Sequence, residues 1–211
     1  MTDYPELDLG PDTDVALETL VTGYRDAVVD VLAAARLGEP IAYLCLSPGQ
    51  EEGMDTLTIM YAGRAADRAR LLSRGVDDWT DVWNPFAMRD EEDMVHPTYD
   101  HEMRSQYVTL APEHRQAWEV VRRALADRCL SAEYWVHRRG ARALNRRTLP
   151  IPRTDDFAVW VFDFNAGQGE LLEMLASVLP SETFDLLRGR GLIGEDEEAA
   201  HLAEWRERSD D

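Results

Sequence analysis

One short run of the sequence limits the fold more than any other. The segment Ile41–Leu46 is apolar at every position, so it predicts a strand that is buried on both faces. Such a strand needs other elements packed above and below it, and we therefore expect a sheet covered by helices. The chain has 211 residues, of which 45% are apolar, which is sufficient for a core of this kind without a disulfide or a structural metal.

Two further runs predict strands beside the first. Thr56–Tyr61 alternates between apolar and polar residues and is expected to form a hairpin with Ile41–Leu46. Phe157–Phe164 is aromatic and β-branched and follows Asp155 and Asp156, which are expected to lie just outside the strand. Because a hairpin stands near the start of the chain, a mixed or antiparallel sheet is favoured over a doubly wound parallel one.

Helical periodicity covers most of the remaining sequence. Tyr134–Val136 fits either a turn of helix or a short strand. The fold class is thus α/β or α+β, with one domain over residues 14–194, a flexible acidic tail over residues 1–13 and a charged helix or tail over residues 195–211. Helices are predicted over Asp14–Ala35, over Ala65–Arg74, from Pro112 through Leu125, over Gly169–Leu179 and over Ser181–Gly189.

The charge of the chain restricts its partners. All 22 basic residues other than histidine are arginines, and 41 acidic residues give a net charge of −19. Because binding to phosphate backbones depends on a basic surface, we expect no useful affinity for DNA, RNA or anionic membranes. The mean field favours a basic or cationic partner, or serves solubility alone.

The middle of the chain departs from this average. Residues 101–150 contain 10 arginines and 5 acidic residues. Two interpretations stay open: the arginines pair internally with the acidic parts of the chain, or they form an anion site from guanidinium forks. The arginines concerned are Arg122, Arg123, Arg138, Arg139, Arg142, Arg146 and Arg147.

Cysteine usage and hydropathy indicate a cytoplasmic protein. Cys45 and Cys129 are far apart and form no C-x-x-C motif, which is typical of a reducing compartment, and both are expected to be small core residues. The N-terminus lacks the basic start and apolar run of a signal peptide. No apolar run reaches the length of a membrane span.

A pair of tryptophans forms the candidate partner site. Trp79 and Trp83 are four residues apart, and Asp77, Asp78 and Asp81 surround them with negative charge. An aromatic pair with an acidic rim suits a basic, partly apolar partner, whereas the alternative is a staple that packs this segment onto the sheet. We expect Trp83 to point inward and Trp79 to lie at the surface. Charge reversal of the three aspartates is expected to slow association while hardly affecting folding.

A second cluster has the residue types of a metal site. His96, Asp100, His101 and Glu102 could support a small hydrolase or another metal-dependent enzyme. Their spacing is not that of H-E-x-x-H, and no motif places a third ligand. We therefore predict neither a cofactor nor a metal requirement for folding.

Several elements in this order carry a resemblance: the helix from Asp14, the hairpin Ile41–Tyr61, the block Asp78–Trp83, a central helix, the late strand, and the closing segment Leu179–Ile193. Together they resemble a family of uncharacterised bacterial domains, some of which are thought to accompany contact-dependent toxins as immunity proteins, in the company of the SUKH group. The resemblance implies a non-catalytic interaction module that neutralises a basic partner such as a toxin domain. It supplies no catalytic residues, and a purely structural subunit is a third possibility.

Overall fold

The computed structural model describes residues 9–35, 37–48, 56–76, 78–84, 106–109, 111, 114–128, 132–161 and 167–195. Four strands within this part form one mixed sheet in the order β3-β2-β1-β4. β1 pairs antiparallel with β2 and parallel with β4, and β3 adds antiparallel to the outer edge of β2. The strands are β1 (Ile41–Pro48), β2 (Thr56–Arg64), β3 (Gln106–Thr109) and β4 (Arg153–Val161).

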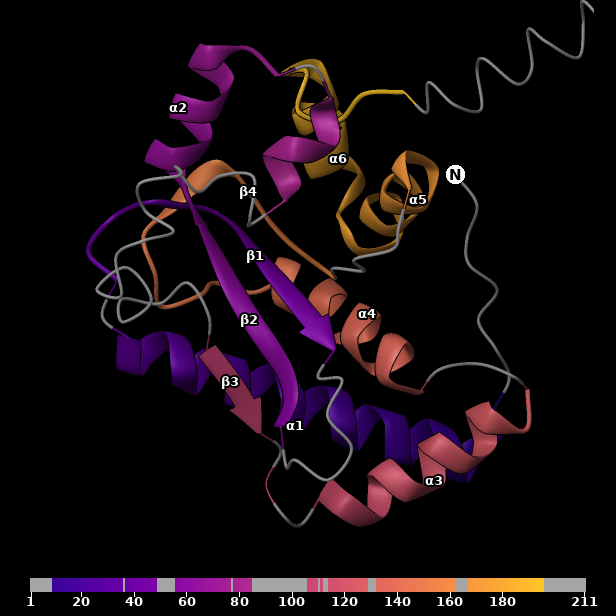
Figure 1. Cartoon of the computed structure of the whole chain (residues 1–211). Coiled ribbons are helices and arrows are strands. Elements are labelled where there is room, and N and C mark those ends of the chain that lie inside the picture. The colour runs from indigo at the N-terminus through magenta and orange to yellow at the C-terminus, as the bar shows by residue number, and fades with distance from the viewer. Residues whose placement is uncertain are drawn as a thin grey trace, which may run out of the picture.

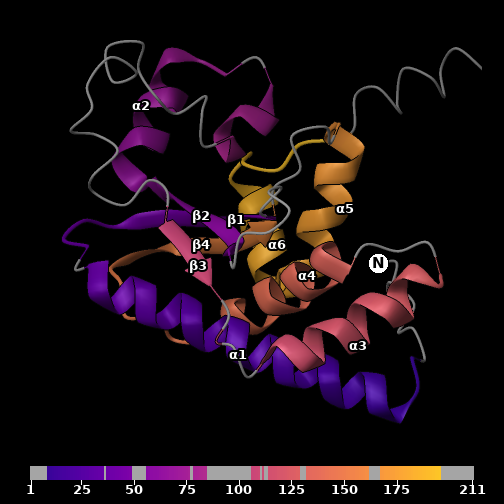
Figure 2. The ribbon, with the colours of Figure 1, turned by 60° about the horizontal axis from the view of Figure 1, so that its bottom comes forward.

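Helices pack on both faces of this sheet. α1 and α4 lie on one face, with α3 beside α1, and α2 and the 3-10 helix η1 lie on the opposite face (Figure 1, Figure 2). α5 and α6 pack beside β4. The helices are α1 (Pro11–Ala35), α2 (Ala65–Arg74), η1 (Trp79–Trp83), α3 (Arg115–Ala126), α4 (Ala132–Asn145), α5 (Gln168–Val178) and α6 (Ser181–Gly189).

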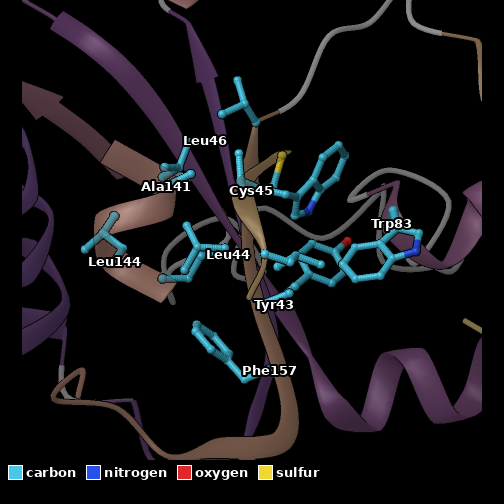
Figure 3. Close-up of a cluster of buried hydrophobic side chains, with 14 of the residues drawn as sticks. Tyr43, Leu44, Cys45, Leu46, Trp83, Ala141, Leu144 and Phe157 are labelled. Atoms are coloured by element: carbon cyan, nitrogen blue, oxygen red, sulfur yellow. The ribbon is translucent and has the colours of Figure 1, made fainter. Parts of the chain in front are cut away.

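The core fills both sides of β1. On one side Leu44 points toward Ala141 and Leu144 of α4, and on the other Tyr43 points toward Trp83 of η1 (Figure 3). Tyr43, Trp83 and Trp160 form an aromatic group with ring centroids 5.8 to 6.2 Å apart. The run Ile41–Leu46 is fully buried, as its composition predicts.

α4 is fixed in place by its last residue and by one glycine. The Asn145 side chain donates to the Val159 and Val178 carbonyls, at 2.7 and 3.0 Å, and accepts from the Val159 N–H at 2.7 Å. It thereby satisfies backbone groups at an edge of β4 that none of the described strands covers. At Gly140 any Cβ would overlap the Tyr24 ring, so glycine permits the close approach of α1 and α4.

The fold class and most element positions agree with the sequence predictions. A single α/β-type unit with a mixed sheet is observed. The hairpin, α2, α5 and α6 lie within a few residues of their expected bounds, and α2 ends at Gly75 as predicted. Among the described helices, none combines the length and apolar character needed to cross a bilayer.

Several expectations were wrong in detail. α1 begins at Pro11 rather than Asp14, because proline suits the first helical position. Tyr134–Val136, for which the sequence leaves helix and strand both open, belongs to a 14-residue helix. β4 begins at Arg153, so Asp155 and Asp156 lie inside the strand. Strand β3 has no counterpart in the prediction.

Candidate anion-binding site

One face of α4 carries a row of cationic side chains. Arg138, Arg139, Arg142 and Arg146 follow Trp135 at steps of three and four residues. On a helix such spacing places side chains along one stripe. Arg146 stands just after the last helical residue and extends the row.

This row forms one wall of a groove. α1 provides the opposite wall through Glu18, Val21, Thr22 and Arg25, and Ser177 of α5 closes one side. The groove has a volume of about 420 Å³. Among the described residues, five guanidinium groups and one carboxylate line it, so the local charge of this lining is opposite in sign to that of the whole chain.

Two of the arginines are held in fixed orientations. Arg138 donates through Nε to the Ser177 hydroxyl at 3.1 Å, and Arg142 donates through Nε and Nη2 to the Ser177 carbonyl at 3.0 and 2.7 Å. Ser177 is in the last turn of α5, where carbonyls lack helical partners and the helix dipole is negative. These two arginines therefore stabilise the end of α5, and the same contacts orient their guanidinium groups beside the groove.

The other two arginines of the row, Arg139 and Arg146, are not held by hydrogen bonds to Ser177. Within the described part of the chain, neither Arg139 nor Arg146 forms a hydrogen bond or an ion pair. Arg139 is half-buried and Arg146 is exposed. A guanidinium group that no carboxylate neutralises is available to an external anion.

The remaining described arginines of residues 101–150 show that internal pairing accounts for part of the cluster. Arg147 contacts Asp26 of α1 at 3.1 Å, and Arg122 contacts Glu119 at 2.8 Å. Internal pairing therefore holds for Arg122 and Arg147, whereas Arg139 and Arg146 stay candidates for an anion site.

The groove has two chemically different ends. Leu17 and Leu20 of α1 share a core cluster with Val136, whereas Asp26, further along α1, pairs with Arg147. α1 and α4 therefore run in the same general direction. Glu18 and Trp135 lie at one end of the groove, and Arg25 and Arg146 lie at the other.

The side chains that line the groove suit the binding of an anion. Among the described residues they include five guanidinium groups, one carboxylate and two hydroxyl groups. The described residues hold no group of three or more metal-ligating side chains. Cys45 is fully buried in the core, and burial raises the pKa of its thiol well above the usual value, so it is no nucleophile in this conformation.

Comparison with protein-family models, curated proteins and solved structures finds no match to this chain. The resemblance to toxin-immunity domains therefore stays a prediction.

The tryptophan pair is placed by the segment that follows α6. Trp83 is 1% exposed and donates through Nε1 to the Leu192 carbonyl at 2.7 Å. Trp79 is half-buried and donates to the Glu195 carbonyl at 3.1 Å, and any Cβ at Gly194 would overlap its ring. Both rings thus act as staples, and Trp83 offers no surface to a partner in this conformation.

Of the acidic rim, Asp77 lies outside the described residues, and Asp78 and Asp81 are half-buried. The Asp78 carboxylate accepts from the Thr80 N–H at 2.8 Å and caps η1. Burial opposes ionisation of Asp78, but hydrogen bonds from Thr80 and from the Gln168 side chain outweigh it and lower the pKa of Asp78. The basic-partner site stays a prediction, to which only the rim and part of Trp79 could contribute surface.

The cap changes the expected result of charge reversal. Asp78→Ala is expected to lower the free energy of unfolding by about 1 kcal/mol through loss of the N-cap, measured by urea denaturation. The expectation that reversing all three aspartates hardly affects folding is therefore revised for Asp78. Asp78→Asn, which can still accept the bond, is the matched control and should retain most of the stability. An equal loss in both variants would contradict a capping role.

The other sequence candidates are not placed by the structure. His96, Asp100, His101 and Glu102 lie outside the described residues, as does Cys129. The residues that sequence reasoning missed are Glu18, Arg25, Trp135 and Ser177. Only Trp135 had a usable signal, because it lies in helical register with the arginines after it.

Proposed function

We propose that this chain is a non-catalytic binding module that recognises a compact anionic group through the arginine groove between α1 and α4. The observation that carries the proposal is the presence of Arg139 and Arg146, without partners among the described residues, beside two arginines that Ser177 already orients. Guanidinium forks bind phosphate and carboxylate groups in bidentate geometry. Pre-oriented donors reduce the entropy lost on binding.

The overall charge defines which anions are suitable. A net charge of −19 repels an extended polyanion over most of the surface. At physiological ionic strength this repulsion is screened over about 8 Å, so a small ligand that enters the groove interacts mainly with the local arginines. This supports a compact anion and agrees with the expectation that nucleic acids are not bound. The net charge alone indicates a basic partner, whereas the groove indicates an anionic one.

The groove arginines supply a direct test. Calorimetric titration of the full chain with inorganic phosphate and pyrophosphate is expected to show saturable binding that weakens as salt is added. The double variant R139A/R146A should weaken it at least tenfold, because hydrogen bonds to charged groups contribute about 1.5–3 kcal/mol each. Its melting temperature should stay near that of the wild type, since neither side chain has an internal partner among the described residues.

Arg122→Ala is the matched control, because Arg122 is an exposed arginine that contacts Glu119 away from the groove. It should leave anion binding unchanged. Equal weakening by Arg122→Ala and by R139A/R146A would indicate nonspecific attraction. Absence of saturable binding by the wild type would also contradict the proposal.

A further inference from the structure

The end of the groove opposite Arg146 offers a planar apolar surface. Trp135 is half-buried, packs against the second core cluster, which contains Val136 and Leu17, and also lines the groove. One part of its indole is therefore supported by the core while another part contacts the groove space. A tryptophan held in this way can stack against a flat ring.

The distance from this surface to the cations follows from helix geometry. At a rise of about 1.5 Å per residue, Arg139 lies about 6 Å along α4 from Trp135, Arg142 about 10 Å and Arg146 about 16 Å. A ligand that contacts Trp135 and the nearer arginines, Arg139 and Arg142, must join a planar ring to one or more anionic groups through a spacer of one to two helical turns, about 6–10 Å. A bare anion would leave the Trp135 end unused.

The polar groups along the groove further restrict the class of ligand. Glu18 is the one carboxylate that the described residues contribute to the lining, and it lies near Trp135, so it can accept hydrogen bonds from donors on the ring or on its spacer. Thr22 adds a hydroxyl group on the same wall. A volume of about 420 Å³ falls within the range of small-molecule sites.

We infer that the groove binds a nucleoside phosphate, with the base stacked on Trp135 and the phosphate on Arg139, Arg142 and Arg146. This rests on the proposed anion-binding function and specifies its ligand. The base stacks on the Trp135 indole, and the base amino and ribose hydroxyl groups form hydrogen bonds with Glu18 and Thr22. The ribose is the spacer between the base and the phosphate. The ligand is a free nucleotide, because a nucleic acid strand would extend the charge beyond the groove into a negative surface.

The test compares three probes of decreasing size on the full chain at constant ionic strength: adenosine monophosphate, ribose 5-phosphate and inorganic phosphate. Stacking of a base on an aromatic side chain predicts that adenosine monophosphate binds about tenfold more tightly than ribose 5-phosphate. Trp135→Leu should abolish that difference, whereas Trp135→Phe should retain most of it. R139A/R146A should weaken all three probes.

A second measurement keeps the inference testable if Trp135→Leu does not fold. The indole N–H signal of Trp135 in the NMR spectrum, assigned through Trp135→Phe, should shift on addition of adenosine monophosphate and hardly shift with ribose 5-phosphate. If all three probes bind equally, or if an acidic peptide binds more tightly than the nucleotide, the nucleotide inference is overturned while anion binding stands. If no probe binds, the proposed function fails as well.

Discussion

Trp83→Ala is expected to lower the free energy of unfolding by about 3–5 kcal/mol. The ring is 1% exposed and packs edge-on against Trp160, with centroids 6.0 Å apart, and in a tilted arrangement against Tyr43, with centroids 5.8 Å apart. Alanine would leave a cavity between η1 and the sheet and would remove the donor to the Leu192 carbonyl. Urea denaturation followed by circular dichroism measures the change.

Trp79→Ala is the matched comparison. Trp79 belongs to the same 3-10 helix and donates to the same segment, but its ring is only half-buried. Because less apolar surface is removed from water at this position, the loss of stability should be less than half of that for Trp83→Ala. Equal losses of unfolding free energy in the two variants would mean that the rings contribute equally to the core. A loss under about 1 kcal/mol for Trp83→Ala, well below the usual cost of such a truncation, would contradict the buried position of Trp83.

The same pair of variants separates the two hypotheses for this segment. If Trp79 also contributes to a partner surface, Trp79→Ala should weaken association with a basic partner more than it lowers stability. Trp83→Ala should act through stability alone.

The sheet and its flanking helices could be predicted because their signals are local. Ile41–Leu46 is apolar throughout, and the aromatic and β-branched run that begins at Phe157 needs no long-range information to indicate a strand. β3 could not be found in this way. It has only four residues, Gln106–Thr109, and its pairing with the edge of β2 defines it more than its composition does.

α4 shows why part of the site was hidden. Its buried residues Val136, Ala141 and Leu144 alternate with arginines and with Gly140, so the apolar stripe is narrow and the helical signal is weak. The arginines could be identified as a candidate anion site from the sequence, because guanidinium groups bind anions. Glu18, Arg25 and Ser177 could not, because only the packing of α1 and α5 against α4 brings them to the groove.

β4 shows a different limit. Asp155 and Asp156 have low strand propensity, and sequence reasoning therefore placed them outside the strand. Within the fold, Arg68 of α2 and Arg190, which follows α6, neutralise them. The ion pairs extend β4 beyond its apolar run, and residues more than thirty positions away in sequence supply them.

Asp156→Ala is accordingly expected to destabilise the fold by about 3–5 kcal/mol, the usual cost of breaking a buried ion pair. Asp156 is 3% exposed, and its carboxylate accepts from Arg68 Nη2 at 2.6 Å and from Arg190 Nη1 at 2.9 Å. Arg68 is itself only 7% exposed, so removal of the carboxylate leaves a buried cation without its main counter-charge. Asp155→Ala is the control, because this exposed aspartate contacts Arg190 alone among the described arginines, and little change is expected.

The effect of Asp156→Ala should also depend on pH. Burial raises the pKa of Asp156, but Thr154 and the guanidinium groups of Arg68 and Arg190 outweigh it and lower the pKa below 3.8. Hydrogen bonds from Arg190 likewise lower the pKa of Asp155 to about 2.

A carboxyl group whose pKa is lower in the folded state stabilises the fold above its unfolded pKa, and this contribution is lost as the pH falls through the folded value. The stability difference between the wild type and Asp156→Ala should therefore be constant above about pH 5 and should shrink as the pH falls below about 4. Denaturation midpoints measured from pH 7 to pH 3 test this, and a difference that stays constant over the whole range would show that the Asp156 carboxylate is not the acid-sensitive group.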